Sequence, residues 1–470
     1  MGHTPQPSAL QISLKPQSMP VNDYSRIKLS WYPQKAELTA PLYLSLASAL
    51  ERDILSGALC PGTKLPSQRE LADYLDINFT TVTRAYDLCR EKNLIYGITG
   101  RGTFVSPGQM GQQTPQALEL GVVLGFPSLI DPVVEAARQV LSRDYLREMF
   151  SYTERLGMAH HRAVAVQWMR ASGIRADAEC TAVFAGAQNA ISVALLSLFQ
   201  LGDAIAVDSF TYANMIKAAH MAHLKLVPIP GDDAGMRPDA LDMACQNRAV
   251  KGIFLMPNCA NPTTITMPEP RRDALAEVCQ KHALTILEDD AALMPDDARH
   301  AFFERLPEQT LYIAASTRHI APGLRVTFAT YPQRFAAPLA QGLYATNIKA
   351  SALDTEILSE LIVSGNARKL LASKYELAIQ ANKIFEQIFP GPGPDSAFFR
   401  CLPLTRTSEN GPELEHRLLS QGIKVCHSYR FATEKNPQTQ FLRLSLSSTH
   451  SLTELEKALR LLKTHLSDSD

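Results

Sequence analysis

The sequence predicts a multidomain protein in which a small N-terminal α+β module precedes a larger α/β domain and a small C-terminal α+β domain. The N-terminal part shows three short helical periods, followed by two alternating apolar stretches around a Gly-rich turn. The middle of the chain alternates short apolar runs with amphipathic helical patterns, which is typical of a mostly parallel sheet covered by helices. With 470 residues, the chain is long enough for about three domains.

Composition and charge exclude several classes of protein. The chain is 46% hydrophobic and 20% charged, so it can bury large cores and is not typical of a disordered protein. Its net charge of -1 gives no attraction of the whole protein to nucleic acid, so any DNA binding depends on a local face. No apolar run approaches the roughly 18–20 residues that span a bilayer, and the eight cysteines form no CxxC pair. We therefore expect a cytoplasmic protein with reduced thiols, no membrane partner and no metal site.

The N-terminal module has recognisable helix and turn signals. Residues 1–36 are Pro-rich and aperiodic, and we expect a mobile tail there. A capping box is predicted at Ser67, because Glu70 follows three residues later and opens an apolar helical period. The elements expected next are helices over 41–56, 67–75 and 80–92, and a hairpin over 94–105 with its tip at 99–102. Three helices and a two-stranded wing are typical of a winged helix-turn-helix, which we place at 37–106, followed by a linker at 107–119.

In a winged helix-turn-helix, the third helix enters the major groove by its N-terminal turn. The side chains of this helix that are expected to reach base edges or phosphates are Thr80, Thr81, Thr83 and Arg84. Arg69 can hold a phosphate from the second helix, and Arg101 can reach the minor groove or the DNA backbone from the wing tip. The alternative is that these arginines are solvated surface charges, since residues 41–105 hold seven Lys or Arg and seven Asp or Glu and have no net charge.

The module resembles the GntR family of bacterial regulators. The resemblance runs through PGTKLPSQRELA at 61–72, TVTRAY at 81–86 and GRGTFV at 100–105, so it is long and ordered. It implies double-stranded operator DNA as a partner. The sequence departs from the family pattern at Phe79, where many relatives carry a basic or polar residue.

The central region predicts a mostly parallel sheet covered on both faces. Its strands are expected at 180–184, 204–207, 224–228, 252–256, 284–287, 311–313 and 326–330. We place this larger domain at 120–340 and the smaller α+β domain at 341–470, with one long helical region over 352–388 and a last helix over 451–466. Ligands of such sheets bind at the carboxyl ends of the strands.

The residues at those strand ends resemble fold-type-I pyridoxal phosphate (PLP) enzymes. The matching segments are PNCANPT at 257–263, EDD at 288–290 and PGLR at 322–325. Joined to a GntR-type module, they identify the chain as a member of the MocR subfamily of regulators. The resemblance therefore implies a fold-type-I PLP-transferase-like domain after the winged helix-turn-helix.

The resemblance also implies roles for single residues. The cofactor phosphate would lie at the helix start formed by Gly186, Ala187 and Gln188, where backbone N–H groups favour an anion, and would be clamped by Arg325. The other implied contacts are Tyr212 stacking on the pyridine ring, Asn261 on its hydroxyl, Asp289 on its nitrogen and Arg443 on a substrate carboxylate. Without the resemblance, Tyr212 would be a core residue, Asp289 part of a solvated strand end or a helix cap, and Arg443 an exposed ion-pair partner.

Arg318 stands where the family has the lysine that holds PLP. The PGLR segment at 322–325 fixes the alignment, and no lysine lies between Lys281 and Lys349. A guanidinium stays protonated and does not attack an aldehyde as a lysine amine does. Further departures from the family pattern are Thr264, Ala291, Ala314 and Ala315. We therefore expect no catalytic residue and no covalent cofactor, while non-covalent PLP binding stays open.

Three hypotheses follow. The first is a transcription regulator that dimerises through its aminotransferase-like domain and senses a small anionic metabolite, bound by Arg325, Arg443 and Arg318 beside Asp289. The alternative is a PLP-dependent aminotransferase that carries a DNA-binding arm. The third is a dimerisation scaffold without a ligand.

Overall fold

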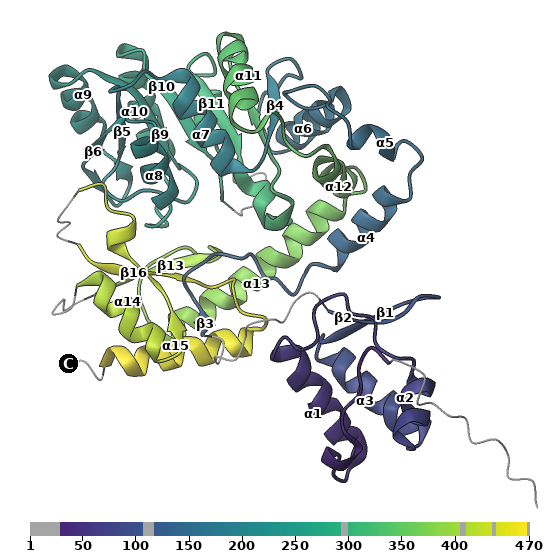
Figure 1. Cartoon of the computed structure of the whole chain (residues 1–470). Helices are drawn as coiled ribbons and strands as arrows, with labels where there is room; N and C mark the ends of the chain where they lie inside the picture. The colour runs from purple at the N-terminus through teal and green to yellow at the C-terminus, as the bar shows by residue number, and fades with distance from the viewer. Residues whose placement is uncertain (1–28, 107–116, 293–298, 405–409, 435–438, 468–470) are drawn as a thin grey trace, which may run out of the picture. The chain divides into compact units, whose positions relative to one another are not determined.

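The computed structural model describes residues 29–106, 117–292, 299–404, 410–434 and 439–467, and the side chains of Ser316, Arg318 and Ser467 lie outside the description. The chain forms two compact units, residues 1–116 and 117–470 (Figure 1). Most of the expected tail (1–28) and most of the expected linker (107–116) lie outside the described residues.

The first unit contains the three helices and the hairpin that the sequence predicts. They are α1 (Leu42–Leu55), α2 (Gln68–Leu75), α3 (Phe79–Glu91), β1 (Ile95–Ile98) and β2 (Gly102–Val105). The predicted capping box is present, because Ser67 Oγ accepts from the Glu70 amide and the Glu70 carboxylate accepts from the Ser67 amide. The predicted inward faces form one core, in which Leu50, Leu71 and Val82 are fully buried.

The described part of this unit begins before α1. Trp31 lies inside the range expected to be a tail, yet it is buried against the core, and its Nε1 donates to Asp53 Oδ2 at 2.9 Å. A 3-10 turn follows over Lys35–Glu37. A single buried aromatic in a Pro-rich stretch has no periodicity, so the pattern gave no sign of it.

The second unit is built on a seven-stranded sheet in the order β4-β12-β11-β10-β9-β5-β6. Its strands are β4 (Thr181–Phe184), β5 (Ala204–Asp208), β6 (Lys225–Ile229), β9 (Val250–Leu255), β10 (Thr285–Asp289), β11 (Thr310–Ala314) and β12 (Thr327–Thr330). Neighbours pair in parallel except around β12, which is antiparallel to both β11 and β4. All seven predicted strands and the mostly parallel sheet are thus confirmed.

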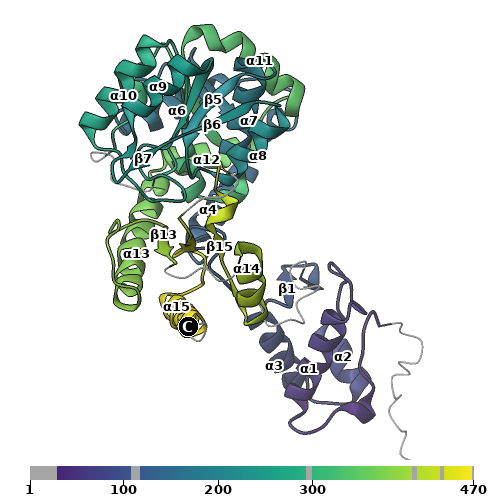
Figure 2. The ribbon, with the colours of Figure 1, turned by 90° about the vertical axis from the view of Figure 1, so that its left-hand side faces the viewer.

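Helices cover both faces of this sheet (Figures 1 and 2). One face packs on α7 (Ala187–Leu198), α8 (Ala213–Met221) and α11 (Gln333–Asn347). The other face packs on α4 (Asp131–Leu141), α6 (Ala159–Ala171), α9 (Pro238–Asn247), α10 (Glu269–Lys281) and α12 (Ala352–Val363). Short elements connect them: α5 (Leu146–Met149), β7 (Gly231–Asp232) and β8 (Gly235–Met236). Because alternate strand residues enter opposite cores, the sheet is apolar on both faces.

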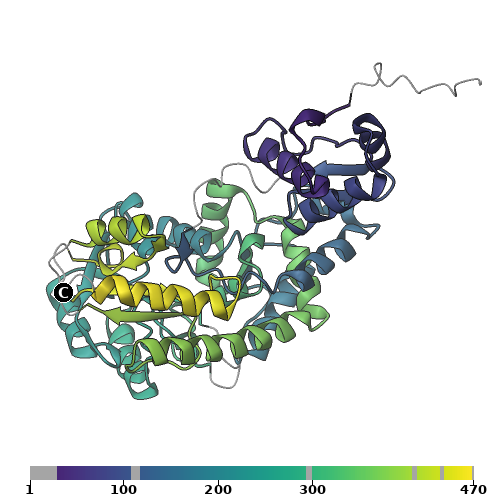
Figure 3. The same ribbon diagram turned by 90° about the horizontal axis from the view of Figure 1, so that it is seen from below.

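The C-terminal part forms a smaller α+β layer. A three-stranded antiparallel sheet, β13-β16-β15, packs with two helices that lie side by side, α13 (Asn366–Ile388) and α15 (Leu452–Ser467) (Figure 3). Its other elements are β13 (Phe399–Pro403), α14 (Gly411–Ser420), β14 (Ile423–Lys424), β15 (Cys426–His427) and β16 (Phe441–Ser445). A strand that falls in the expected linker range, β3 (Leu118–Glu119), pairs in parallel with β14.

The long helical region expected over 352–388 is confirmed, and it contains one break that the sequence did not predict. The chain forms two helices there, and α12 ends before Ser364 while α13 begins after Gly365. Gly365 has a φ of 76°, a left-handed conformation that glycine adopts without strain and that ends an α-helix. The break at Ser364–Gly365 allows α13 to run through the smaller layer while α12 packs on α4 and α6. The boundary expected at residue 340 stays a prediction. None of the described helices is long and apolar enough to cross a lipid bilayer.

Candidate DNA interface and ligand site

The first turn of α3 is exposed and is fixed by its cap. Asn78 Oδ1 accepts from the Thr80 amide at 2.9 Å and from the Thr80 hydroxyl at 2.8 Å. Thr83 Oγ1 donates to Gln68 Oε1 at 2.9 Å, which joins α3 to α2. Phe79 is 46% exposed beside these hydroxyls. The helix start therefore presents polar groups in defined positions, with Gln68 as a neighbour that sequence reasoning did not single out.

Three arginines and one lysine of the first unit are candidates for contacts with DNA, and they differ in how their side chains are held. Arg84 is exposed and lies 4.0 Å from the centre of the Tyr43 ring of α1, so an aromatic face orients its guanidinium. Arg69 is exposed on α2, and Arg101 is exposed at the turn between β1 and β2. Lys64 lies along the wing, since a Cβ atom on Gly102 would stand 2.9 Å from Lys64 Cε. Lys64 was missed because nothing in the sequence signals its pairing with Phe104.

A candidate anion site, which we call the anion cradle, lies at the start of α7. Gly186 is the N-cap of this helix and has a φ of 84°, and a Cβ atom there would lie 2.6 Å from Arg325 Nη2. Only glycine fits both the backbone conformation and the close approach of the guanidinium. The backbone N–H groups of Ala187 and Gln188 begin the helix at the same point. Arg325 and Gly186, which the resemblance assigns to the same phosphate site, therefore lie side by side.

Tyr212 and Gln188 are joined through a third residue. Gln188 Nε2 donates to the Asn214 carbonyl oxygen at 3.3 Å, and Asn214 Nδ2 donates to the Tyr212 hydroxyl at 3.3 Å. Tyr212 is the N-cap of α8, so the starts of α7 and α8 lie next to each other. This places an aromatic ring close to the anion cradle.

The three acids at the end of β10 are all buried, so they are not a solvated strand end. Glu288 accepts from the Phe302 and Phe303 amides at 2.8 and 2.7 Å, and burial raises the pKa of Glu288 to about 8. Asp290 Oδ2 accepts from the Tyr312 hydroxyl at 2.6 Å and also pairs with Arg299. Asp289 alternates with them and shares its face of the strand with Leu287, which packs on the α7 side. Asp289 therefore belongs to the face that carries the anion cradle.

Arg443 is buried rather than exposed. It is 8% exposed on β16, where Nη1 donates to Asn261 Oδ1 at 3.2 Å and Nη2 donates to the Gly121 carbonyl oxygen. Asn261 itself is 3% exposed and precedes a cis bond to Pro262. Two residues predicted from separate motifs thus form one hydrogen-bonded pair.

The segment that contains Arg318 lies between β11 and β12. It forms a 3-10 turn over Ala315–His319, in which the Thr317 hydroxyl donates to the Val326 carbonyl oxygen at 2.9 Å. His319 Nε2 lies 2.7 Å from the Ala291 carbonyl oxygen. The buried Lys374 of α13 donates to the His319 carbonyl oxygen at 2.6 Å, and burial lowers the pKa of Lys374 to about 8. Contacts from three directions hold this backbone in place.

A cavity of about 90 Å³ adjoins this segment. It is lined by Asn258, Cys259 and Asn261 on one side, by Ala291 and His319 on another, and by Ser396, Phe398 and Phe399 of the smaller layer. The His319 ring meets Phe398 edge-on, with centroids 4.5 Å apart. Among the predicted site residues, Asn261 lines this cavity. His319 and Phe398 were missed, because no motif joins residues so far apart in the sequence.

A winged helix-turn-helix and a separate α/β unit with an anion cradle at its sheet edge define a DNA-binding regulator built on an aminotransferase fold. Comparison with known families agrees. Residues 42–105 match the bacterial regulatory proteins of the gntR family, and residues 122–462 match the aminotransferase class I and II family. The chain belongs to the GntR-type transcriptional regulators that carry a class I and II aminotransferase domain.

Two curated relatives illustrate this family. The HTH-type transcriptional regulator YdeF of Bacillus subtilis is 32% identical over 461 residues, which cover 96% of this chain and 100% of YdeF. The vitamin B6 salvage pathway transcriptional repressor PtsJ of Salmonella typhimurium is 24% identical, over 62% of this chain and 68% of PtsJ. This chain is accordingly a transcriptional regulator with a DNA-binding module.

Solved structures agree on the fold of the second unit. LysN, an α-aminoadipate aminotransferase from Thermus thermophilus, matches with a TM-score of 0.67 at 22% identity, covering 75% of this chain and 92% of LysN. An archaeal alanine:glyoxylate aminotransferase matches with the same TM-score at 20% identity, covering 76% of this chain and 92% of that enzyme. The fold is that of fold-type-I aminotransferases.

Proposed function

We propose that the second unit is a sensor that binds a small anionic metabolite without covalent PLP chemistry and thereby controls the DNA-binding module. The observation that carries this proposal is the pairing of Arg325 with Gly186 at the start of α7. A cradle for an anion is retained, whereas the residue at the covalent anchor is Arg318. A site that has an anion cradle but no lysine anchor supports ligand binding rather than group transfer.

The charges of the site favour a zwitterionic or phosphorylated ligand. Arg325 and the N-terminus of α7 offer donors to a phosphate or carboxylate. Asp289 supplies a buried carboxylate on the same face of the sheet, suited to a cationic nitrogen. Arg443 contributes a second guanidinium next to Asn261. The similarity to PtsJ makes vitamin B6 phosphates the first ligands to test.

We further propose that the second unit dimerises, that the protein acts in the cytoplasm, and that the domains divide as the sequence predicts.

DNA contacts are assigned to the exposed face of the first unit, through Arg69, Thr80, Thr81, Thr83, Arg84 and Arg101. Lys64 is added to this set because it lies along the wing. The face is supported by the match to the gntR family over 42–105.

The test is a thermal-shift and calorimetric titration of the full chain with PLP, pyridoxamine phosphate, inorganic phosphate, amino acids and keto acids. PLP is expected to raise the melting temperature of the wild type and not that of Arg325→Gln. Arg460→Ala, which removes an exposed arginine paired with Glu456 on α15, is the matched control and should respond like the wild type. If phosphate compounds, amino acids and keto acids all leave the wild type unshifted, the sensing proposal is wrong.

An aminotransferase with a DNA-binding arm is the second candidate, and Lys374 is the observation that favours it. This amine is buried, contacts the backbone directly after Arg318, and has a pKa that burial lowers to about 8. Covalent attachment of PLP to Lys374, trapped by borohydride and located by mass spectrometry, would support this candidate.

The third candidate, a scaffold without a ligand, makes a different prediction. Asp289→Ala would then leave operator binding and regulation unchanged, because the buried carboxylate would have no ligand to contact. Under the sensor proposal, the same variant loses the effector response while its operator binding without effector stays close to that of the wild type.

A further inference from the structure

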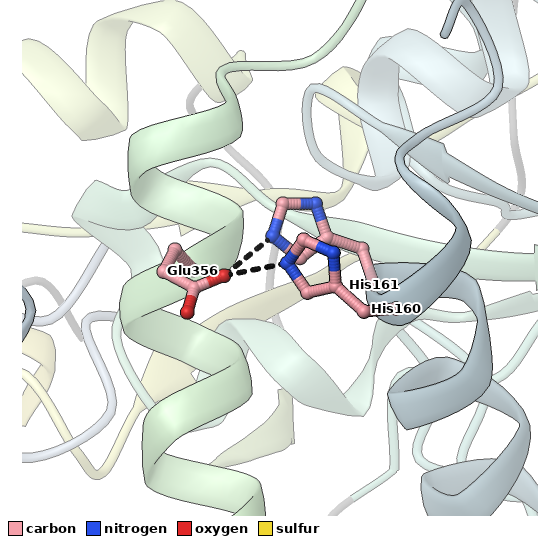
Figure 4. Close-up of side chains that lie close together, drawn as sticks. All are labelled: His160, His161 and Glu356. Carbon is pink, nitrogen blue, oxygen red and sulfur yellow. Dashed lines mark hydrogen bonds and ion pairs between the residues drawn. The ribbon is translucent and has the colours of Figure 1, made fainter. Parts of the chain in front are cut away.

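We propose that His160, His161 and Glu356 form a binding site for a divalent transition metal, with Zn²⁺ as the best fit. Both imidazole Nε2 atoms lie 2.8 Å from the same oxygen, Oε2 of Glu356 (Figure 4). The three candidate ligand atoms all lie within 4.8 Å of one another. The site lies between the first turn of α6 and the middle of α12, away from the anion cradle in both sequence and sheet face.

The convergence of the two rings is unusual for neighbouring residues of a helix. Successive side chains of an α-helix point about 100° apart, yet the rings of His160 and His161 have centroids 4.0 Å apart and turn the same nitrogen to Glu356 (Figure 4). Two imidazoles and one carboxylate form a ligand set that suits Zn²⁺ and its neighbours in the first transition row, and not Mg²⁺ or Ca²⁺, which prefer oxygen.

The second oxygen of Glu356 is occupied by residues that orient it. The Tyr145 hydroxyl donates to Oε1 at 2.7 Å, and Arg143 Nη1 donates to it at 3.0 Å. Glu356 is 4% exposed, so these donors fix the carboxylate with Oε2 turned to the imidazoles. Ligands of metal sites are commonly held in this way by a surrounding layer of hydrogen bonds.

The geometry needs only a small adjustment. Zn²⁺ bonds nitrogen and oxygen at about 2.0–2.2 Å, so tetrahedral ligand atoms stand about 3.3 Å apart. The present separations of 2.8 Å widen to that value by rotation of the side chains. On binding, each imidazole presents the Nε2 lone pair and carries its proton on Nδ1. His161 is 1% exposed and the His160 side chain 49%, which leaves one open side for entry and for a water as fourth ligand.

The alternative is that the cluster is only a hydrogen-bonded clamp between α6 and α12. Glu356 is already satisfied by four donors, so the clamp needs no metal. The two possibilities differ in the response to Zn²⁺, and neither depends on the ligand bound at Arg325.

The test is a Zn²⁺ titration of the chelator-treated full chain, with Co²⁺ absorption spectra as a second readout. The wild type is expected to bind one ion per chain, and His160→Ala, a change at a half-exposed side chain, to lose it. Tyr145→Phe should weaken binding about 10–100-fold through the lost hydrogen bond to the ligand carboxylate. His220→Ala, which removes an exposed imidazole on α8, should bind like the wild type.

Melting temperatures without metal show whether each variant is folded. If folded His160→Ala binds Zn²⁺ as tightly as the wild type, or if the wild type binds no ion that perturbs the Co²⁺ spectrum, the site is only a hydrogen-bonded clamp and the proposal is wrong.

Discussion

The two units of this chain resemble their families in different ways. In the first unit, the family pattern extends through every element, and the capping box, the N-cap of α3 and the stacking of Arg84 on Tyr43 hold the expected face in place. In the second unit, the seven-stranded fold is present, and we assign Gly186 to an anion cradle and Arg318 to the position of the covalent anchor. We therefore expect the first unit to keep the DNA-binding function of its family, and the second unit to keep the fold without the covalent chemistry.

The largest expected effect concerns the hydrogen bonds that join His160 and His161 of α6 to Glu356 of α12. Burial alone would raise the pKa of Glu356, but hydrogen bonds from His161, Tyr145 and His160 outweigh it and lower the pKa from 4.5 to about 2 in the folded protein. The stabilisation that the Glu356 carboxylate provides is therefore complete above pH 4.5 and is lost as the pH falls through about 2. The full contribution is on the order of 3 kcal/mol.

Glu356→Gln should therefore be less stable than the wild type at pH 7, and the difference should shrink between pH 5 and pH 3. Urea unfolding with a chelator present measures it. A difference that stays constant over this range would show that the carboxylate charge does not hold the clamp.

The next effect concerns the first unit. Arg84→Ala is expected to weaken operator binding by about 1–3 kcal/mol, because its oriented guanidinium is assigned to a base or a firmly held phosphate. Arg90→Ala, at the far end of α3 and paired with Asp87, is the matched control and should change binding little. Fluorescence anisotropy over a salt series measures both. Equal losses for the two variants would mean that α3 enters the groove in another orientation.

The smallest effect concerns the capping box. Ser67→Ala removes the side chain that accepts from the Glu70 amide and should cost about 1 kcal/mol of stability in the first unit. Ser48→Ala, an exposed change inside α1, should be neutral or slightly stabilising. Hydrogen exchange at the backbone amides of α2 measures the difference between the two variants. Unchanged protection in Ser67→Ala would show that packing alone fixes the start of α2.

Local signals predicted the fold well. The seven strands are short apolar runs between helical periods, and the capping box at Ser67 is a pattern of four residues. The break at Gly365 was missed because an isolated glycine inside a helical period is tolerated as often as it ends a helix. The buried Trp31 was missed because it depends on Asp53, outside its own segment.

The site was less predictable, because its contacts join residues that are far apart in the sequence. Arg443 and Asn261 are 182 residues apart in the sequence, and His161 and Glu356 are 195 apart. Motifs name Asn261 and Asp289 as participants, but they do not say that Arg443 donates to Asn261. His160 and His161 carry no motif at all, and only the packing of α6 on α12 brings them to a carboxylate.

The most direct test of the account compares the full-length wild type with Arg318→Lys, each incubated with PLP, reduced with borohydride and digested for mass spectrometry. We predict no covalently attached PLP on the wild type, and attachment at position 318 in the variant, because the cradle at Gly186 and Arg325 remains and only the anchor is restored. Near-stoichiometric attachment to a lysine of the wild type, Lys374 included, would contradict it.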